Sequence, residues 1–378
     1  MGTDRYLRHS LIDWFSQDEV RAARVAVIGA GAVGNEVVKN LALLGVGAMD
    51  VYDFDRVERH NLTRSIFLRE SDVGASKAEA VVARARSVDP SVELHAVDGD
   101  FWRTLRLSAL ARYRTVVSCV DNFEARLRVN QMCLIAGVDL VSAGVDSRFV
   151  TVETFPFSSD AIPACYECHL PHSAYQRIAE RYSCGWLRKT AYTERKIPTT
   201  TITASIAGAL AASAALRLGD AHDRTVRRVF FDTLGGASTV TTLDRQTECA
   251  GCGLFARRPR VIAAGNDWAR RLSEATGADA SSTRLALRLS DALIAGYECA
   301  SCGDTSRGAD FVDRRAADFD DRIMRCAVCG LRAARVQIRD EFTAEELATR
   351  FCGDAPPAKY ALADAGGEWI CLDFEEQE

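Results

Sequence analysis

Apolar runs that end at glycine or at acidic residues alternate with helical patterns along the first two thirds of the chain. The runs are short enough for buried parallel strands, and they lie at 24–30, 49–54, 115–120 and 139–143. The helical patterns between them lie at 34–44, 76–87 and 125–136. Strands that alternate with helices predict a doubly wound α/β domain with a mostly parallel sheet.

Further segments extend this domain and separate it from the rest of the chain. Residues 150–157 and 226–244 favour strands of an antiparallel or mixed part of the sheet, and 199–218 favours a packed helix of small residues. A cysteine-bearing loop is inserted between 169 and 198. The predicted domain covers residues 1–256.

The C-terminal extension, residues 257–378, has a different pattern. The spacing predicts a helix over 268–295, a second short helix over 343–351, and a hairpin that turns at Gly366-Gly367. Two C-x-x-C knuckles lie between the two helices. We therefore expect a small extension that resembles a zinc ribbon.

Composition narrows the class of protein. The 378 residues are 48% apolar and 26% charged, which is typical of a globular protein and excludes a disordered or fibrous one. The net charge of −5 makes nucleic acid an unexpected main partner. Residues 1–10 lack an apolar signal, and the Ala-rich stretch 199–218 is too polar to span a membrane. We expect a cytoplasmic setting, in which paired cysteines bind metal more often than they form disulfides.

The strongest local motif is the glycine pattern at Gly29, Gly31 and Gly34, which follows a strand and opens a helix. Glycines let backbone N–H groups approach a phosphate, and a helix N-terminus favours negative charge. Asp53 ends the second strand, where it can accept hydrogen bonds from a ribose. This motif alone leaves three interpretations open: NAD, another nucleotide, or a tight turn without a ligand.

Charged residues downstream argue against NAD. Asn61, Arg64 and Lys77 would form a cluster suited to a polyphosphate, and Lys77 begins a predicted helix. Asp121 follows a parallel strand at its carboxyl end, where an aspartate beside phosphates commonly holds Mg²⁺. Asp55, two residues after Asp53, completes the predicted nucleotide-binding set. Hydride transfer needs no such set.

Six segments together resemble the ThiF/MoeB/HesA superfamily, the adenylating enzymes related to ubiquitin-activating enzymes. They are RYLRH at 5–9, GAGAVG at 29–34, DFDRVERHNLTR at 53–64, GASK at 74–77, SCVDN at 118–122 and PTTTITASIAG at 198–208. The resemblance covers about residues 5–255 and includes the C-x-x-C pairs at 165/168 and 249/252. It implies a Rossmann-like sheet, a homodimer, and an ATP- and carrier-binding domain over 1–256.

The resemblance also implies residue roles and an activity. Asp53 would bind the ribose, Asn61, Arg64 and Lys77 the ATP phosphates, Asp121 Mg²⁺, and Arg8 the γ-phosphate of the neighbouring subunit. Ser65 stands where the family usually carries Gln. The implied substrate is a small ubiquitin-like or sulfur-carrier protein with a C-terminal Gly. A downstream acceptor protein would then receive the activated carrier. A ribosomal peptide, a carboxylate on tRNA, and a non-catalytic peptide-binding relative remain alternatives.

The charges are suited to adenylation. A carboxylate held in line with the α-phosphorus can attack it once Arg64, Lys77 and Mg²⁺ screen the phosphate charge and stabilise the leaving pyrophosphate. The product is an acyl-adenylate, which a thiol, an amine or sulfide can then attack.

Eight of the 13 cysteines fall in four C-x-x-C pairs, which predict two tetrahedral Zn²⁺ sites. The predicted ligands are Cys165, Cys168, Cys249 and Cys252 for the first site, and Cys299, Cys302, Cys326 and Cys329 for the second. Four thiolates close the coordination shell, so each site would be structural. Reduced cysteines without metal, and iron in place of zinc, are the alternatives.

Cys184 stands apart from these pairs in a polar loop that contains Arg181 and Arg188. Nearby positive charge favours the thiolate, so we predict that Cys184 is an acyl-accepting nucleophile. The alternative is a loop cysteine without a catalytic role.

Overall fold

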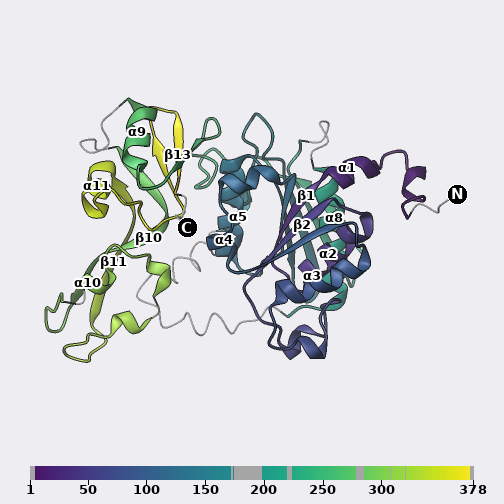
Figure 1. Cartoon of the computed structure of the whole chain (residues 1–378), viewed down its shortest axis with the longest axis horizontal. Coiled ribbons are helices and arrows are strands. Elements are labelled where there is room, and N and C mark those ends of the chain that lie inside the picture. The colour runs from purple at the N-terminus through teal and green to yellow at the C-terminus, as the bar shows by residue number, and fades with distance from the viewer. Residues whose placement is uncertain are drawn as a thin grey trace. The chain divides into compact units, whose positions relative to one another are not determined.

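The computed structural model describes residues 5–171, 173, 198–218, 224–277, 285–306, 308–319 and 321–374. These residues divide into two compact units (Figure 1). The first unit contains residues 5–170 and 198–254, and the second contains residues 171, 173 and those described between 255 and 374.

The first unit is built around an eight-stranded sheet with the order β3-β2-β1-β4-β5-β6-β7-β8. Strands β3 to β5 in that order are parallel, and β5 to β8 are antiparallel. The strands are β1 Arg24–Ile28, β2 Ala48–Asp53, β3 Glu93–Asp98, β4 Thr115–Ser118, β5 Asp139–Val145, β6 Phe149–Phe155, β7 Arg227–Asp232 and β8 Ser238–Thr242. The predicted doubly wound domain is confirmed, and β3 is a strand that the apolar pattern did not predict.

Helices cover both faces of this sheet (Figure 1). The larger apolar core lies between the sheet and α2, α3 and α8, whereas α4 and α5 lie on the other face. The helices of the unit are α1 Gln17–Ala22, α2 Ala32–Leu44, α3 Lys77–Val88, α4 Phe101–Thr104, α5 Phe123–Ala136 and α8 Thr201–Arg217. Among the helices that the structure describes, none combines the length and the apolarity needed to cross a membrane.

Small residues let α8 pack tightly against α2. Gly208 of α8 faces Glu36 so closely that a Cβ at Gly208 would lie 2.3 Å from the Cβ of Glu36. Ala204, Ala207 and Ala211 of α8 are fully buried. The predicted helix of small residues at 199–218 is therefore confirmed as a core helix.

The second unit contains a five-stranded sheet with the order β11-β10-β12-β13-β9. Its strands are β9 Arg260–Ala264, β10 Ala286–Cys299, β11 Ala334–Thr343, β12 Tyr360–Asp364 and β13 Trp369–Phe374. The helices α9 Trp268–Thr276 and α11 Ala344–Phe351 contribute Trp268, Leu272 and Leu347 to its apolar core, and α10 is Gly308–Phe311. The extension is therefore a sheet with its own core, to which the cysteine knuckles are attached.

The prediction of one helix over 268–295 is wrong. Helix α9 ends at Thr276, and the following Gly277 adopts a left-handed conformation with φ of 71°. The chain resumes as β10, in which Leu287, Leu289 and Leu293 are buried and the intervening Arg288 is exposed. This two-residue alternation is the signature of a strand with one buried face.

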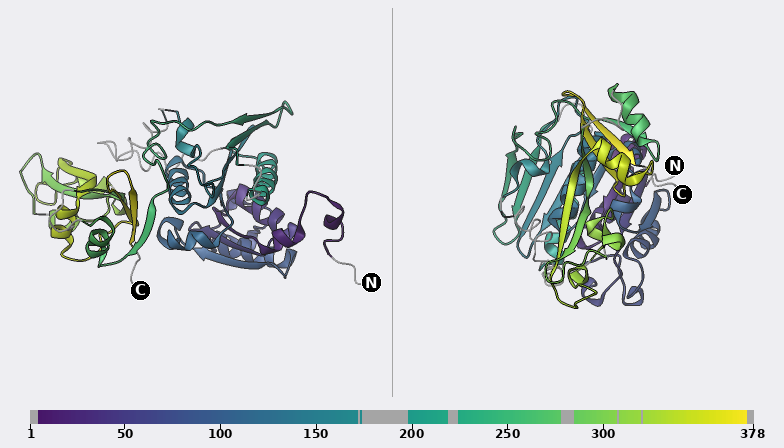
Figure 2. Two further views of the ribbon diagram at one scale, coloured as in Figure 1. Left: turned by 90° about the horizontal axis from the view of Figure 1, so that it is seen from above. Right: turned by 90° about the vertical axis from the view of Figure 1, so that its left-hand side faces the viewer.

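The remaining predictions for the extension are confirmed. Helix α11 begins directly after Thr343, whose hydroxyl accepts a hydrogen bond from the N–H of Glu346. Strands β12 and β13 pair as a hairpin around Gly366 and Gly367, both of which have positive φ. Figure 2 shows this hairpin, in yellow, from two further directions.

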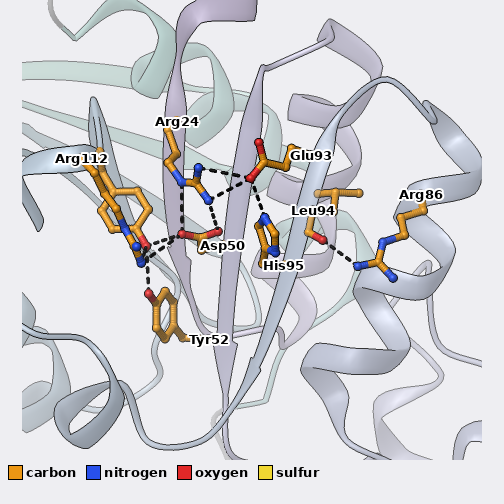
Figure 3. Close-up of polar contacts among 9 residues, drawn as sticks. Arg24, Asp50, Tyr52, Arg86, Glu93, Leu94, His95 and Arg112 are labelled. Carbon is orange, nitrogen blue, oxygen red and sulfur yellow. Dashed lines mark hydrogen bonds and ion pairs between the residues drawn. The ribbon is translucent and has the colours of Figure 1, made fainter. Parts of the chain in front are cut away.

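A network of charged residues joins β1, β2 and β3 (Figure 3). Arg24 of β1 contacts Asp50 of β2 at 3.1 Å and Glu93 of β3 at 3.3 Å. Asp50 is 3% exposed and also accepts a hydrogen bond from the Tyr113 hydroxyl. Burial alone would raise the pKa of Asp50, but the hydrogen bonds of Arg24 and Tyr113 outweigh it and hold that pKa below its usual value. The Asp50 carboxylate therefore stabilises the folded state.

We expect the Asp50→Asn variant to lose about 3 kcal/mol of unfolding free energy at pH 7, because it leaves Arg24 without its buried partner. Since the folded pKa is lowered, the stabilisation by Asp50 is present above the unfolded pKa of about 4 and is lost as the pH falls through the folded value. Urea denaturation between pH 2 and 7 measures both effects. The matched variant Glu93→Gln, at a mostly exposed partner of Arg24, should lose much less unfolding free energy than Asp50→Asn, because solvent screens this ion pair. Equal losses in the two variants would contradict this role of Asp50.

Candidate active site

The glycine turn between β1 and α2 combines tight packing with an open approach. Gly29 has φ of 97°, and a Cβ at this position would lie 3.0 Å from the Cys119 carbonyl oxygen. A Cβ at Gly34 would lie 1.9 Å from the Gly29 carbonyl oxygen, so only glycine fits there. A Cβ at Gly31, in contrast, would meet no atom within 4 Å. The N-terminus of α2 is therefore open at Gly31, where backbone N–H groups can meet a phosphate.

Asp53 ties the end of β2 to this turn. Its carboxylate accepts hydrogen bonds from the backbone N–H groups of Ala30 at 2.7 Å and of Asp55 at 2.8 Å. Burial raises the pKa of Asp53, although these hydrogen bonds and the charge of Lys77 act in the opposite direction. A carboxylate has about four acceptor positions, so Asp53 can still accept a hydrogen bond from a ribose hydroxyl.

Asn35 is a central residue of the site that the sequence analysis missed. Its fully buried amide donates to the carbonyl oxygens of Ala30 at 2.7 Å and of Gly31 at 3.0 Å. Its amide oxygen accepts a hydrogen bond from the N–H of Phe67 at 3.0 Å. Asn35 thus joins the glycine turn to the segment that carries Arg64. The available signal was an amide on the buried side of a helix, directly after Gly34.

Lys77 begins α3 and contacts Asp55. Its ammonium group lies 2.7 Å from the Asp55 carboxylate, and the Lys77 side chain is only 10% exposed. The two loops are also joined through their backbones, since the N–H of Lys77 donates to the Asp55 carbonyl and the N–H of Val57 donates to Ala75. The structure therefore places Lys77, Asp55 and Asp53 together at the carboxyl end of β2.

Arg64 and Asn61 belong to the loop that follows β2. The Arg64 guanidinium donates to the His60 carbonyl oxygen at 2.9 Å, and it forms no ion pair with any carboxylate that the structure describes. Asn61 is buried, and its amide oxygen accepts a hydrogen bond from the N–H of Glu58 at 2.8 Å. The Arg64 guanidinium is therefore available to an anion. The Asn61 amide oxygen instead stabilises the turn at residues 58–61.

Asp121 lies between β4 and α5, beside a pocket of about 300 Å³. Its carboxylate is exposed and has no hydrogen bond or ion pair to another described residue. The neighbouring Asn122 caps α5 by accepting a hydrogen bond from the N–H of Ala125. A free carboxylate at the carboxyl end of a parallel strand fits a divalent cation.

Arg126 is a second residue that the sequence analysis missed. Its guanidinium donates to the Val120 carbonyl at 2.5 Å, the Ala143 carbonyl at 2.7 Å and the Ser142 hydroxyl at 2.7 Å. These bonds join the ends of β4 and β5 to α5. Arg126 thereby fixes the wall of the pocket that Asp121 borders.

One predicted catalytic residue, Arg8, is not brought to this site within one chain. Arg8 is exposed in an N-terminal segment, whose Tyr6 hydroxyl is hydrogen-bonded to Asp89 at the end of α3. That end of α3 lies opposite its Lys77 end, so the predicted contact of Arg8 with a phosphate requires a neighbouring subunit and stays a prediction. Cys184 lies outside the described residues.

The first cysteine cluster joins two distant segments of the first unit. The sulfur atoms of Cys165 and Cys249 are 3.6 Å apart, and those of Cys168 and Cys252 are 3.3 Å apart. Four sulfurs at about 2.3 Å from a zinc ion lie roughly 3.8 Å from one another, whereas a disulfide needs about 2 Å. The cluster therefore fits a tetrahedral metal ion, and four thiolates leave no open position on it.

The second cluster has the same geometry in the second unit. Cys299 and Cys329 are 3.7 Å apart at sulfur, and so are Cys302 and Cys326. Gly303 and Gly330 follow the two knuckles with φ of 69° and 70°, as the predicted tight turns require. This cluster also fits a tetrahedral metal ion, although Cys302 is exposed.

Comparisons with known proteins find relatives of the first unit. The model of the ThiF family matches residues 3–251 of the chain. SAMP-activating enzyme E1 of Haloferax volcanii is 33% identical over 178 residues, which are 45% of this chain and 63% of that protein. Sulfur carrier protein adenylyltransferase of Thermus thermophilus is 28% identical over 66% of this chain and 90% of its own length.

Other relatives match over shorter parts of their length. Ubiquitin-like modifier-activating enzyme 5 of Bombyx mori is 29% identical over 48% of each chain. The chain thus spans less than two thirds of the Haloferax and Bombyx relatives.

A crystal structure of E. coli MccB with ATP has a TM-score of 0.52 and 21% identity, over 67% of this chain and 75% of MccB. At that identity the likeness shows the fold alone.

Proposed function

The chain belongs to the ThiF family, and from this membership we propose that it uses ATP to adenylate the C-terminal carboxylate of a small ubiquitin-like or sulfur-carrier protein. The observation that carries the proposal is the set of unpaired or weakly paired charges at one edge of the sheet. Arg64 has no carboxylate partner among the described residues, and Asp121 has no polar partner there at all. A protein that only binds a partner needs neither the Arg64 cation nor the Asp121 carboxylate beside a glycine turn.

The proposed reaction takes place at the α-phosphorus of ATP. The open turn at Gly31 receives the phosphates, and Asp53 accepts hydrogen bonds from the ribose. An oxygen of the substrate carboxylate forms a bond to the α-phosphorus while the bond to the β-phosphate oxygen breaks, and pyrophosphate leaves with its electron pair. Arg64 and Lys77 neutralise the charge that gathers on the pyrophosphate. Mg²⁺, for which Asp121 offers a carboxylate, supplies further neutralisation when it is bound.

The pocket beside Asp121 is the proposed site of the acyl substrate. It is lined by the start of α5, the β5–β6 turn, Tyr166 and residues of β6 and β7. A chain that ends in glycine needs little of the 300 Å³ available there. The pocket therefore favours a second candidate substrate, a peptide whose terminal residue carries a side chain.

We further propose that two copies of the chain cooperate. The N-terminal segment holds Arg8 away from the glycine turn of its own chain, as the contact between Tyr6 and Asp89 requires. Leu7, Leu11 and Trp14 of this segment are also exposed, which suits an interface. In the proposed homodimer, Arg8 reaches the γ-phosphate bound by its partner.

The fate of the acyl-adenylate completes the proposal. Cys184 attacks the acyl carbon, AMP leaves, and a thioester forms that a downstream acceptor protein resolves. Zinc in the two cysteine clusters has a structural role, because neither cluster leaves a coordination position open.

Carrier-dependent exchange of radiolabelled pyrophosphate into ATP tests the proposed function. We expect exchange when the protein is mixed with Mg²⁺, ATP and a carrier encoded beside it, and none when the carrier lacks its last residue. Intact-mass spectrometry of the same mixture should show a covalent adduct that thiol reductants remove, and the Cys184→Ser variant should keep exchange but lose this adduct. Absence of exchange with every neighbouring carrier and peptide would overturn the proposal.

A further inference from the structure

Tyr166 connects the first cysteine cluster to the acyl pocket. It lies between Cys165 and Cys168 in the first knuckle, within the short helix η5 Tyr166–His169. Its side chain lines the same pocket as Asp121. A residue of the metal-binding knuckle is therefore also a wall of the site in which the substrate carboxylate is proposed to react.

The knuckle that contains Tyr166 contacts α5 and the other knuckle of the same cluster. Its N–H donates to the buried amide oxygen of Asn130 in α5 at 2.9 Å. The other knuckle of this cluster, Cys249–Cys252, packs against the first one at Gly251. A Cβ at Gly251 would lie 2.4 Å from the Glu167 carboxylate and 3.3 Å from the Cys165 sulfur. The two knuckles are far apart in the sequence and meet at the four sulfur atoms, and a hydrogen bond between His169 and the Asp244 carbonyl oxygen joins the same two segments.

The ring of Tyr166 is fixed, but its hydroxyl group is free. The ring packs edge-to-face against Phe155, with ring centres 6.4 Å apart. The hydroxyl group has no hydrogen-bond partner among the described residues, and it is not enclosed by protein atoms. It can therefore meet a ligand in the pocket.

Two further aromatic residues line the pocket. Phe149 and Phe230 stack with their ring centres 5.0 Å apart, and both line the pocket with Tyr166. Glu153, which also lines the pocket, is 4% exposed and paired with Arg228 at 2.6 Å. With Glu153 neutralised by its partner, the pocket offers these aromatic faces and the Tyr166 hydroxyl group to a side chain, beside the polar residues Asp121, Asp146 and Thr151.

We propose that Tyr166 is a specificity-determining residue of the acyl pocket, and that the metal of the first cluster is what holds it in position. This inference rests on the proposed function, and within it on the second candidate substrate, a peptide whose terminal residue carries a side chain. It assigns the cluster a second role besides stabilising the fold, since loss of the metal frees the knuckle and with it one wall of the pocket. The substrate class that fits is a carboxylate whose terminal residue carries an aromatic or large apolar side chain.

Binding of three nucleotide probes to the metal-loaded full-length protein tests this inference. The probes are AMP, glycyl-sulfamoyl adenosine and phenylalanyl-sulfamoyl adenosine, and isothermal calorimetry measures their Kd values. We expect the parent protein to prefer the phenylalanyl probe, because the aromatic walls give it additional contacts. Tyr166→Ala should raise the Kd of that probe by about tenfold and leave the Kd of AMP unchanged. Tyr166→Phe, which keeps the ring, should restore most of the affinity.

Cysteine variants test the role of the metal. Cys168→Ser should lose one metal ion per chain and the preference for the phenylalanyl probe, whereas the matched variant Cys302→Ser should lose one metal ion and keep that preference. Should Cys168→Ser fail to fold, the Tyr166 variants still decide the specificity role.

The outcomes separate this inference from the proposed function. If the parent binds none of the three probes, the proposed nucleotide site is wrong. If it binds them and Tyr166→Ala changes all three alike, or changes none, only the role of Tyr166 is overturned. An equal loss of preference in Cys302→Ser would overturn the coupling to the first metal.

Discussion

The Arg64→Ala variant is expected to lose about 1,000-fold in pyrophosphate exchange while it unfolds at nearly the temperature of the parent. The structure separates these effects, because the Arg64 guanidinium makes only a hydrogen bond to the His60 carbonyl and no ion pair among the described residues. Loss of one such bond costs about 1 kcal/mol. A cation that neutralises charge on transferring phosphates contributes 10²–10⁵ in rate. The loss should fall mainly on kcat, because the charge on the pyrophosphate grows in the transition state.

A matched variant lies in the same loop. Arg59 is also an arginine, but its side chain is 81% exposed and pairs with Glu70 at 2.5 Å on the surface. Arg59→Ala should keep exchange within about twofold of the parent. Parallel exchange assays and thermal melts of the two variants check the prediction. Exchange by Arg64→Ala within a factor of two of the parent would show that Arg64 does not act on the phosphates.

The sequence predicted best those features that depend on neighbouring residues. The parallel strands β1, β2, β4 and β5 are short apolar runs, and the glycine turn is a local backbone requirement. Strand β3 was missed because it is an edge strand, where Glu93, His95 and Asp98 replace the apolar residues of a central strand. Strand β10 was missed because the predicted helix was extended past Gly277 into residues whose apolar side chains alternate with polar ones.

The residues that the sequence analysis missed act through partners far away in the chain. Asn35 accepts a hydrogen bond from Phe67, Arg126 reaches the end of β5, and Tyr166 enters the pocket beside Asp121. Each is ordinary in its local pattern, and only the order of strands in the sheet brings its partners close. The cysteine clusters were predictable across such distances because metal ligands carry a spacing signature of their own.

The Cys249→Ser variant is expected to lose one of two bound metal ions and to destabilise the first unit. Cys249 and Cys252 tie the segment that follows β8 to the knuckle at Cys165 and Cys168. Zinc-binding free energy in finger peptides is about 10–16 kcal/mol, but this unit also has a large apolar core, so we expect a loss of about 3 kcal/mol or more. For a unit of this size, that loss lowers Tm by roughly 6–12 °C.

Another cysteine provides the control for this prediction. Cys352 is exposed and belongs to neither cluster, so Cys352→Ser should keep both metal ions and the Tm of the parent. Metal analysis of the purified variants, followed by thermal melts with and without a chelator, measures both quantities. Chelation should lower the Tm of the parent but change that of Cys249→Ser much less, because one site is already lost. Two metal ions per chain in Cys249→Ser would mean that the Cys249 sulfur is not a ligand. The metal would then not explain how the segment after β8 is joined to the knuckle that contains Tyr166.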